Sequence, residues 1–253
     1  EGLNLGKCPI VSFSVFGVFI FAAVFRSQEK LDERRVQLLS ENMDLNEQST
    51  VLDIGCGKPS FLSLLHKTFR CKAKGLDFSD EAWNSSPDFA QLDLQMGEIT
   101  QLTKEVQPDA ITMWHYLEHD YAPKKHLKHL HSIVKPGTTL LIEVPNFESE
   151  SRKIYGEHWA GWHTPRHTQL FSPSNISLLL EDTDWQVKKV QNSGSLDPFV
   201  LYWMSEMNRK KIAWNDNLEK EFWPFVASSV LFKFKHWNKK DLSLGVMAIV
   251  AEA

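Results

Sequence analysis

The sequence predicts an α/β fold built on a doubly wound sheet of seven strands. Three observations lead to this prediction. From residue 50 onward, short β-rich runs alternate with helical stretches, the order that builds a parallel sheet with helices on both faces. The apolar runs lack the in/out alternation of half-exposed strands, as expected for strands that are covered on both sides. The first run ends in a Gly-x-Gly turn, where open α/β sheets bind ligands.

The elements follow one another in a regular order. Residues 27–48 are charged and have the apolar spacing of a surface helix. Further helices are expected after Ser60, from Pro123 to Val134, and from Pro173, where Ser172 supplies the N-cap. The predicted strands are residues 51–54, 73–77, 89–93, 110–115, 138–144, 185–190 and 244–251.

Length and composition narrow the class of protein. A chain of 253 residues with 42% hydrophobic and 24% charged residues is typical of a globular domain, which excludes a disordered or multi-span membrane protein. A formal charge of -4 gives no overall electrostatic case for nucleic acid. Three cysteines without paired spacing indicate free thiols in a reducing compartment, so we expect a cytoplasmic protein.

Two segments lie outside the predicted core. Residues 1–48 form an N-terminal apolar and helical segment, and residues 49–253 form one domain with a helical insertion at 198–240. The uncharged run 8–25 could be a membrane anchor, a signal-peptide core or a buried entry helix. The insertion has eight Lys and Arg against four Asp and Glu, interleaved with aromatic residues, and suits either a membrane interface or a substrate lid. Membrane association through 8–25 and 198–240 therefore stays an open expectation.

The glycine turn and a later acid point to a nucleotide-like ligand. Asp53-Ile54-Gly55-Cys56-Gly57 lets the backbone approach a ligand closely at the end of the first strand. Asp77 ends the second strand, where a carboxylate can bind both hydroxyls of a ribose. NAD and S-adenosylmethionine both fit that pattern. The full dinucleotide pattern needs a third glycine where this chain has Ser60, which disfavours NAD.

On these residues the chain resembles the class I S-adenosylmethionine-dependent methyltransferases. The resemblance implies a Rossmann-like sheet of six parallel strands and one antiparallel strand, with S-adenosyl-L-methionine as cofactor. One departure is Pro59, which stands where family members usually have glycine. The cofactor-binding residues that the resemblance implies are Asp53, Gly55, Cys56 and Gly57 at the methionine part, Asp77 and Phe78 at the ribose, Asp93 and Leu94 at the adenine, and Trp114 and His115 after the fourth strand.

A second block narrows the resemblance. Residues 155–172, with Val144-Pro145-Asn146 upstream, resemble the Gly-x-x-Trp…Pro-Arg-His…Phe-Ser block of a subgroup that is distantly similar to ubiquinone-type O-methyltransferases. Members of that subgroup are commonly associated with surface-polysaccharide or lipid pathways. The block lies in a loop after the fifth strand, which we expect to form a lid over the acceptor.

Methyl transfer to a hydroxyl needs alignment and a base, so histidines near the methyl group are the catalytic candidates. His119 is the first choice, followed by His163 and His167; a purely structural histidine is the alternative for each. We expect no metal, because Glu118 and the histidines have irregular spacing. Cys56 has no neighbouring base and is expected to pack rather than react. The candidate substrate-binding residues are Trp159, Trp162 and Arg166.

The sequence therefore predicts an S-adenosylmethionine-dependent methyltransferase. Its expected acceptor is a small molecule or a lipid-linked or saccharide-linked group, methylated at oxygen, and no nucleic-acid partner is expected. The alternative is a catalytically silent scaffold that keeps the fold and uses the aromatic and basic insertion to dock on a membrane or a protein. No pattern in the sequence indicates the oligomeric state.

Overall fold

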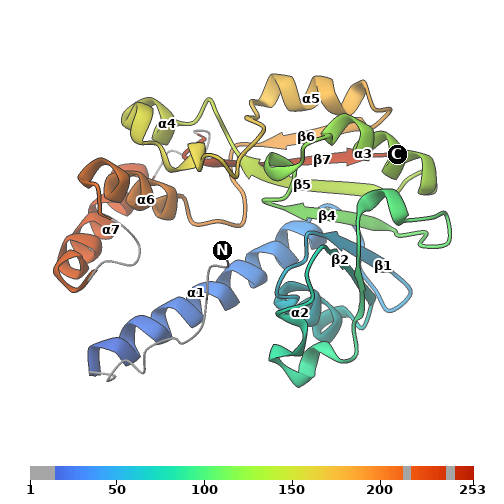
Figure 1. Ribbon diagram of the computed structural model, residues 1–253, viewed down its shortest axis with the longest axis horizontal. Helices are drawn as coiled ribbons and strands as arrows, with labels where there is room; N and C mark the ends of the chain where they lie inside the picture. Colours follow the sequence, from blue (N-terminus) through green and yellow to red (C-terminus); the bar gives the residue numbers. More distant parts are fainter. Residues whose placement is uncertain (1–14, 213–217, 238–242) are drawn as a thin grey trace, which may run out of the picture.

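The computed structural model, which describes residues 15–212, 218–237 and 243–253, contains a single seven-stranded sheet (Figure 1). The strand order is β3-β2-β1-β4-β5-β7-β6, and β7 is antiparallel to both of its neighbours while the other pairs are parallel. The predicted fold class, six parallel strands and one antiparallel strand, is confirmed. The strands are β1 (Thr50–Ile54), β2 (Lys72–Asp77), β3 (Asp93–Met96), β4 (Ala110–Trp114), β5 (Thr139–Pro145), β6 (Gln186–Gln191) and β7 (Val246–Glu252).

One predicted strand was misplaced. The third strand was expected at 89–93, but Pro87–Phe89 forms a 3₁₀ turn and β3 begins at Asp93. Buried Phe89 belongs to that turn, and β3 is a short edge strand that is largely exposed. An exposed edge strand has no apolar run, so the apolar signal pointed to the preceding turn.

Helices cover both faces of the sheet. On one face α1 (Val15–Ser40) and α2 (Ser60–Phe69) pack through a cluster that includes Leu39, Leu62 and Leu65. On the other face α3 (Pro123–Ile133) and α5 (Pro173–Glu181) pack through a second cluster that includes Leu127 and Leu180. Strands buried on both faces explain why the central apolar runs lack alternation.

The N-terminal segment differs from its prediction. A single helix, α1, begins at Val15 and continues through the charged stretch to Ser40, where the sequence suggested a separate helix over 27–48. Residues 8–14 of the uncharged run lie outside the described residues. Within the part of the chain that the structure describes, no helix is both long and apolar enough to cross a membrane.

The insertion between β6 and β7 is helical, as expected. It consists of α6 (Pro198–Lys210), a 3₁₀ turn (Leu218–Glu221) and α7 (Phe222–His236). Together with α4 (Glu150–Tyr155), these helices gather beyond the carboxyl end of β5, at the left of Figure 1, and the N-terminal half of α1 extends toward the same side. The helical insertion and the N-terminal half of α1 therefore both lie on the side of the sheet where the strands have their carboxyl ends and where the candidate site lies.

Candidate active site

The Gly-x-Gly turn at the end of β1 forms one wall of the site. Gly55 has φ +75° and Gly57 has φ +45°, backbone conformations that residues with a side chain rarely adopt. The Gly55 N–H donates to the Leu76 carbonyl at 2.8 Å, which ties the turn to β2. A Cβ atom on Gly55 would lie 2.4 Å from Cδ2 of Tyr116, so the turn fits under Tyr116 only because residue 55 has no side chain.

A cavity of about 380 Å³ opens beside this turn, at the carboxyl ends of the central strands. That volume lies within the usual range for small-molecule sites. Its position is the one at which open α/β sheets bind ligands. The lining residues are Ile54, Gly55, Leu76, Asp77, Phe78, Gly97, Glu98, Ile99, Tyr116, His119, Asp120, Tyr121 and His126.

Two carboxylates support the turn from different sides. Asp77, at the end of β2, accepts hydrogen bonds from the Gly57 N–H at 2.8 Å and from the Ser79 N–H at 3.1 Å. Asp53 is buried below the turn and accepts a 2.7 Å hydrogen bond from the Thr112 hydroxyl. Burial raises the pKa of the Asp53 carboxyl to about 7, although the Thr112 hydrogen bond lowers it. Asp77 thus faces the cavity, and Asp53 acts from beneath it.

The residues that follow β3 form the far wall of the cavity and correct a prediction. Asp93 was expected to end the third strand, but it begins β3, where it is paired in register with Lys74 and forms an ion pair with it. Leu94 packs over Gly75 inside the sheet. Because β3 runs from Asp93 to Met96, the cavity is lined instead by Gly97 and Glu98, which follow the strand.

His115 is held between two buried carboxylates. Its Nδ1 lies 3.2 Å from Oε1 of Glu118, and its Nε2 lies 3.0 Å from Oε1 of Glu143 on β5. Burial would lower the pKa of His115, but the hydrogen bonds and the attraction of both carboxylates outweigh it and raise the pKa to about 10. The same contact with His115 holds the pKa of Glu143 below its usual value despite burial. With both ring nitrogens engaged, His115 acts as a partly buried cation between two buried carboxylates in the framework of the site.

Three histidines meet where the loop of residues 156–171, expected above to form a lid and called the lid loop from here on, contacts the 3₁₀ turn Leu117–His119 that follows β4. The His119 and His167 rings are 4.8 Å apart, and the His163 and His167 rings are 5.0 Å apart. His119 Nδ1 donates to the Arg166 carbonyl at 3.0 Å, and His167 Nδ1 donates to the Gly161 carbonyl at 2.8 Å. A carbonyl only accepts, so Nδ1 of each ring carries the hydrogen and, in the neutral ring, Nε2 keeps its lone pair.

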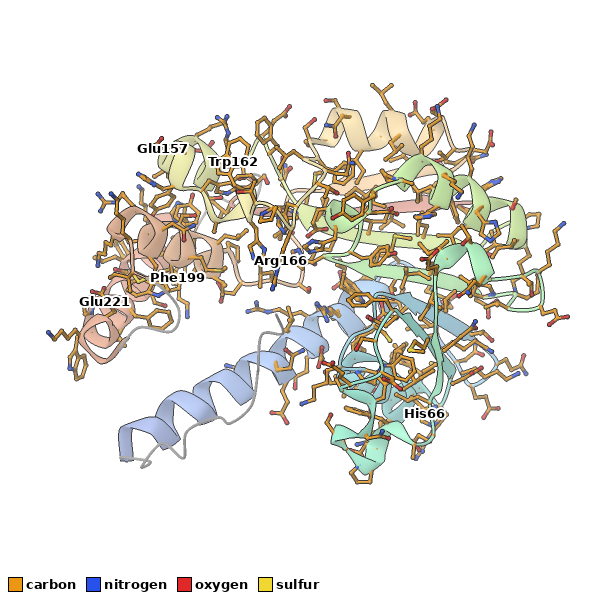
Figure 2. All side chains as sticks on the ribbon, in the orientation of Figure 1. His66, Glu157, Trp162, Arg166, Phe199 and Glu221 are labelled. Atoms are coloured by element: carbon orange, nitrogen blue, oxygen red, sulfur yellow. The ribbon has the colours of Figure 1, made fainter. Side chains whose placement is uncertain are left out.

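Burial lowers the pKa of both His163 and His167; the Arg166 guanidinium adds to the effect at His163, whereas the Gly161 hydrogen bond opposes it at His167. Both rings are therefore neutral at physiological pH and have a basic nitrogen. Figure 2 shows Arg166 at the carboxyl edge of the sheet, on the side toward α1. Its side chain is exposed. The lid loop thus brings the neutral imidazoles of His163 and His167 and the exposed guanidinium of Arg166 to the carboxyl end of the sheet.

The two tryptophans of the lid hold its internal structure. Trp159 is 1% exposed, and its indole N–H donates to the Ser151 hydroxyl at 3.0 Å. The Trp162 indole N–H donates to the Gly156 carbonyl at 2.8 Å. The indole N–H groups of both predicted substrate-binding tryptophans are therefore engaged within the protein, and Trp159 is a core residue of the lid.

A family model described as a methyltransferase domain matches residues 25–190, well over half of the chain. The chain belongs to this methyltransferase family. Membership confirms the predicted enzyme class, and the family together with the fold supports S-adenosyl-L-methionine as its cofactor. A search of curated proteins finds no match for this methyltransferase.

Solved structures share the fold of this methyltransferase at low sequence identity. A chain from the complex between the Haloferax volcanii Trm112 methyltransferase activator and the putative methyltransferase is 18% identical, with 92% of this chain and 96% of that chain covered and a TM-score of 0.61. An S-adenosylmethionine-dependent methyltransferase from Archaeoglobus fulgidus is 19% identical, with coverages of 93% and 99% and a TM-score of 0.58. Magnesium protoporphyrin IX methyltransferase from Synechocystis PCC 6803, solved with bound S-adenosylhomocysteine, is 16% identical, with coverages of 73% and 82% and a TM-score of 0.52.

Some of the predicted site residues of this methyltransferase line the cavity, and others do not. Gly55, Asp77, Phe78 and His119 line it. Sequence reasoning missed Tyr116, Glu98 and the Asp120–His126 pair, although Gly-Glu directly after a short polar strand was a usable signal. The predicted residues behind or beside the cavity are Asp53, Cys56, Gly57, Trp114 and His115, together with the displaced Asp93 and Leu94.

Cys56 and Trp114 are packing residues. The Cys56 sulfur lies against Gly75, and burial, with the charges of Asp53 and Asp77, raises the pKa of its thiol. The Trp114 ring packs edge-on against Phe61 with a ring separation of 5.4 Å. The expectation that Cys56 packs rather than reacts agrees with this environment.

Glu118, His119 and His167 each offer a potential metal-ligand atom, and these atoms lie within 4.8 Å of one another. Glu118 is buried, and its Oε2 has no hydrogen-bond partner within the described residues. The lid creates this proximity, which is why the irregular spacing in the sequence did not indicate it. The set can serve either as proton acceptors or as donors to a divalent cation.

Replacing Gly55 with alanine is expected to weaken S-adenosylhomocysteine binding by at least about tenfold, because the positive φ is strained and the new methyl group displaces Tyr116. Calorimetry on the folded variant measures the affinity. Gly137→Ala is the matched control: Gly137 has φ +84° in the turn before β5, away from the cavity. Equal affinities for Gly55→Ala and the unaltered protein would contradict this role of the turn.

His115 is expected to remain protonated through pH 8, and NMR titration of its ring is the measurement. Its folded pKa of about 10 lies above the ordinary value of 6.5, so the stability it contributes is complete below pH 6.5 and is lost as the pH rises through 10. Glu143→Gln should lower that pKa and cost about 3 kcal/mol of unfolding free energy, because it removes the buried carboxylate partner of His115. The control Glu148→Gln, at an exposed residue, should change stability by less than about 0.5 kcal/mol. Titration of His115 near 6.5 would contradict the assignment.

Proposed function

We propose that this methyltransferase transfers the methyl group of S-adenosylmethionine to a hydroxyl oxygen of a lipid-linked or saccharide-linked acceptor. The observation that carries the proposal is the imidazole pair His119 and His167, each with Nδ1–H donated to a backbone carbonyl and Nε2 left basic, beside the cavity. A hydroxyl acceptor needs a base, because its proton must leave as the new bond forms.

The residues of the cavity fit the cofactor. The glycine turn lies directly under Tyr116 at Gly55 and has open space beside Gly57, which would allow the backbone to approach the methionine part. Asp77 would accept hydrogen bonds from the ribose hydroxyls, and Glu98, rather than Asp93, would accept from the adenine amino group with Ile99 against the ring. Pro59 is the N-cap residue of α2, with φ −81°, and its carbonyl accepts from the Ser63 N–H at 3.0 Å, so the proline is accommodated at the start of the helix.

The bound cofactor supplies an electrophilic methyl group on a sulfonium, whose carbon–sulfur bond breaks as the carbon–oxygen bond forms. In our proposal, the protein aligns the acceptor oxygen with that methyl group and removes the proton of the acceptor hydroxyl. His119 Nε2 accepts the proton, and the Arg166 carbonyl fixes the orientation of the ring. His167 packs edge-on against His119 and keeps the pair in place. The exposed Arg166 guanidinium would bind a phosphate or carboxylate of the acceptor.

An apolar stripe on α7 favours a lipid-linked acceptor over a freely diffusing one. Trp223, Val230, Phe234 and Trp237 are 72%, 63%, 81% and 80% exposed. Their helical spacing places them on one face of the helix. Lys233 and Lys235, which flank Phe234 in the sequence, are exposed on the same helix. Aromatic residues with neighbouring lysines suit the headgroup region of an anionic membrane, where a lipid-linked acceptor resides.

Glu98→Ala is expected to weaken S-adenosylhomocysteine binding by about tenfold, because the adenine amino group loses a charged acceptor. Asp93→Ala is the matched control and should leave the affinity within about twofold, since Asp93 lies at the opposite end of β3. Asp77→Ala should abolish binding. If Asp93→Ala weakened binding more than Glu98→Ala, the adenine would have to lie elsewhere.

Methyl transfer itself is tested with radiolabelled S-adenosylmethionine and fractionated lysate. We expect the label in an organic-soluble product, with transfer unchanged by EDTA and reduced at least about a hundredfold in His119→Ala. Label confined to aqueous products would contradict the lipid-linked acceptor. Loss of transfer in EDTA with recovery on adding a divalent cation would contradict the base role and make Glu118, His119 and His167 ligands instead.

A further inference from the structure

A second cavity lies within the helices that follow the sheet, apart from the cofactor site. Its volume is about 350 Å³, and its walls come from α4, α6 and α7. Most of the lining is aromatic or aliphatic, and Phe199, Tyr202 and Phe232 form its centre, with ring separations of 4.6 to 5.5 Å to Phe232. Figure 2 places Phe199 among these helices, well apart from Arg166 at the edge of the sheet.

The polar groups of this cavity are few. Tyr202 is 7% exposed, and its hydroxyl has no hydrogen-bond partner within the described part of the chain. A buried hydroxyl without a partner is costly, so a ligand group that supplied one would be favoured. At the rim, Lys210 is paired with Glu221 and Glu206 with Arg209, whereas Lys235 has no ion-pair partner among the described residues. Among the described residues, Lys235 therefore supplies a positive charge to the rim that no ion pair compensates.

We infer that this cavity binds the hydrocarbon chain of an anionic amphiphile, with Lys235 at the charged headgroup. The aromatic walls suit a chain, since burial of apolar surface is the main source of affinity in such a site. The exposed face of α7 provides the route of entry, because Leu231 lines the cavity and is 68% exposed next to the apolar stripe.

The cavity is joined to the lid of the active site by direct contacts. Tyr155 lines the cavity and immediately precedes the lid loop. From α6, the Ser205 hydroxyl accepts a 2.9 Å hydrogen bond from the Ala160 N–H, and the Asn208 amide donates to the His158 carbonyl at 3.3 Å. A chain in this cavity would press on the helix that holds the lid. Identification of the amphiphile with the methyl acceptor rests on the proposed function, whereas binding of the chain does not.

Calorimetry with dodecyl phosphate below its micellar concentration tests the inference without cofactor or methyl transfer. We expect saturable one-site binding, weaker by about tenfold for dodecyltrimethylammonium, whose headgroup has the opposite charge. Ser228→Phe, which adds a ring inside the cavity, should weaken dodecyl phosphate binding by at least about tenfold.

Two matched variants separate the cavity from the surface of α7. Lys235→Glu should weaken dodecyl phosphate binding by about tenfold. Lys233 does not line the cavity, so Lys233→Glu should keep the affinity within about twofold of that of the unaltered protein. Unchanged S-adenosylhomocysteine affinity shows that each variant is folded. Equal losses of dodecyl phosphate affinity in the two lysine variants would overturn the inference, and so would an unchanged affinity in Ser228→Phe. Failure of the proposed methyl transfer would leave this binding result intact.

Discussion

The structure of the active site depends on the partly buried cation His115 and the two buried carboxylates that enclose it. A charge removed from water is tolerated only when it is paired and hydrogen-bonded, so the positions of Glu118 and Glu143 around His115 are tightly constrained. Glu143 also accepts hydrogen bonds from the backbone and hydroxyl of Ser195, in the loop that leads to α6. One ion-pair network therefore joins the ends of β4 and β5 to the start of the insertion.

The geometry of the cavity follows from this constraint. The 3₁₀ turn that contains Glu118 places Tyr116 over Gly55 and directs His119 toward the cavity. The Glu118 carbonyl accepts hydrogen bonds from the Thr168 and Gln169 N–H groups, so the same turn anchors the end of the lid. The imidazole pair forms where the anchored lid meets this turn. The residues that we propose to face the cofactor and the acceptor thus meet on a single short segment.

The sheet and the glycine turn could be predicted from the sequence because their causes are local. Strands buried on both faces appear as apolar runs, and a positive φ at a tight turn requires glycine at Gly55. The exposed edge strand β3 gave no such signal, so the sequence placed Asp93 at the end of this strand, where the structure has Gly97 and Glu98 lining the cavity. The sequence also did not indicate that Glu143 is a partner of His115, because the two residues are 28 positions apart and meet only through neighbouring strands. Likewise, His119 and Arg166 are 47 residues apart and meet only through the folded lid.

The crystal structure of the complex with S-adenosylhomocysteine is the most direct test of this methyltransferase site. The predicted result has the ribose hydroxyls on Asp77, the adenine amino group on Glu98 and the sulfur on the side of His119. A ligand with its adenine against Asp93, or bound away from the Gly55 turn, would contradict the account.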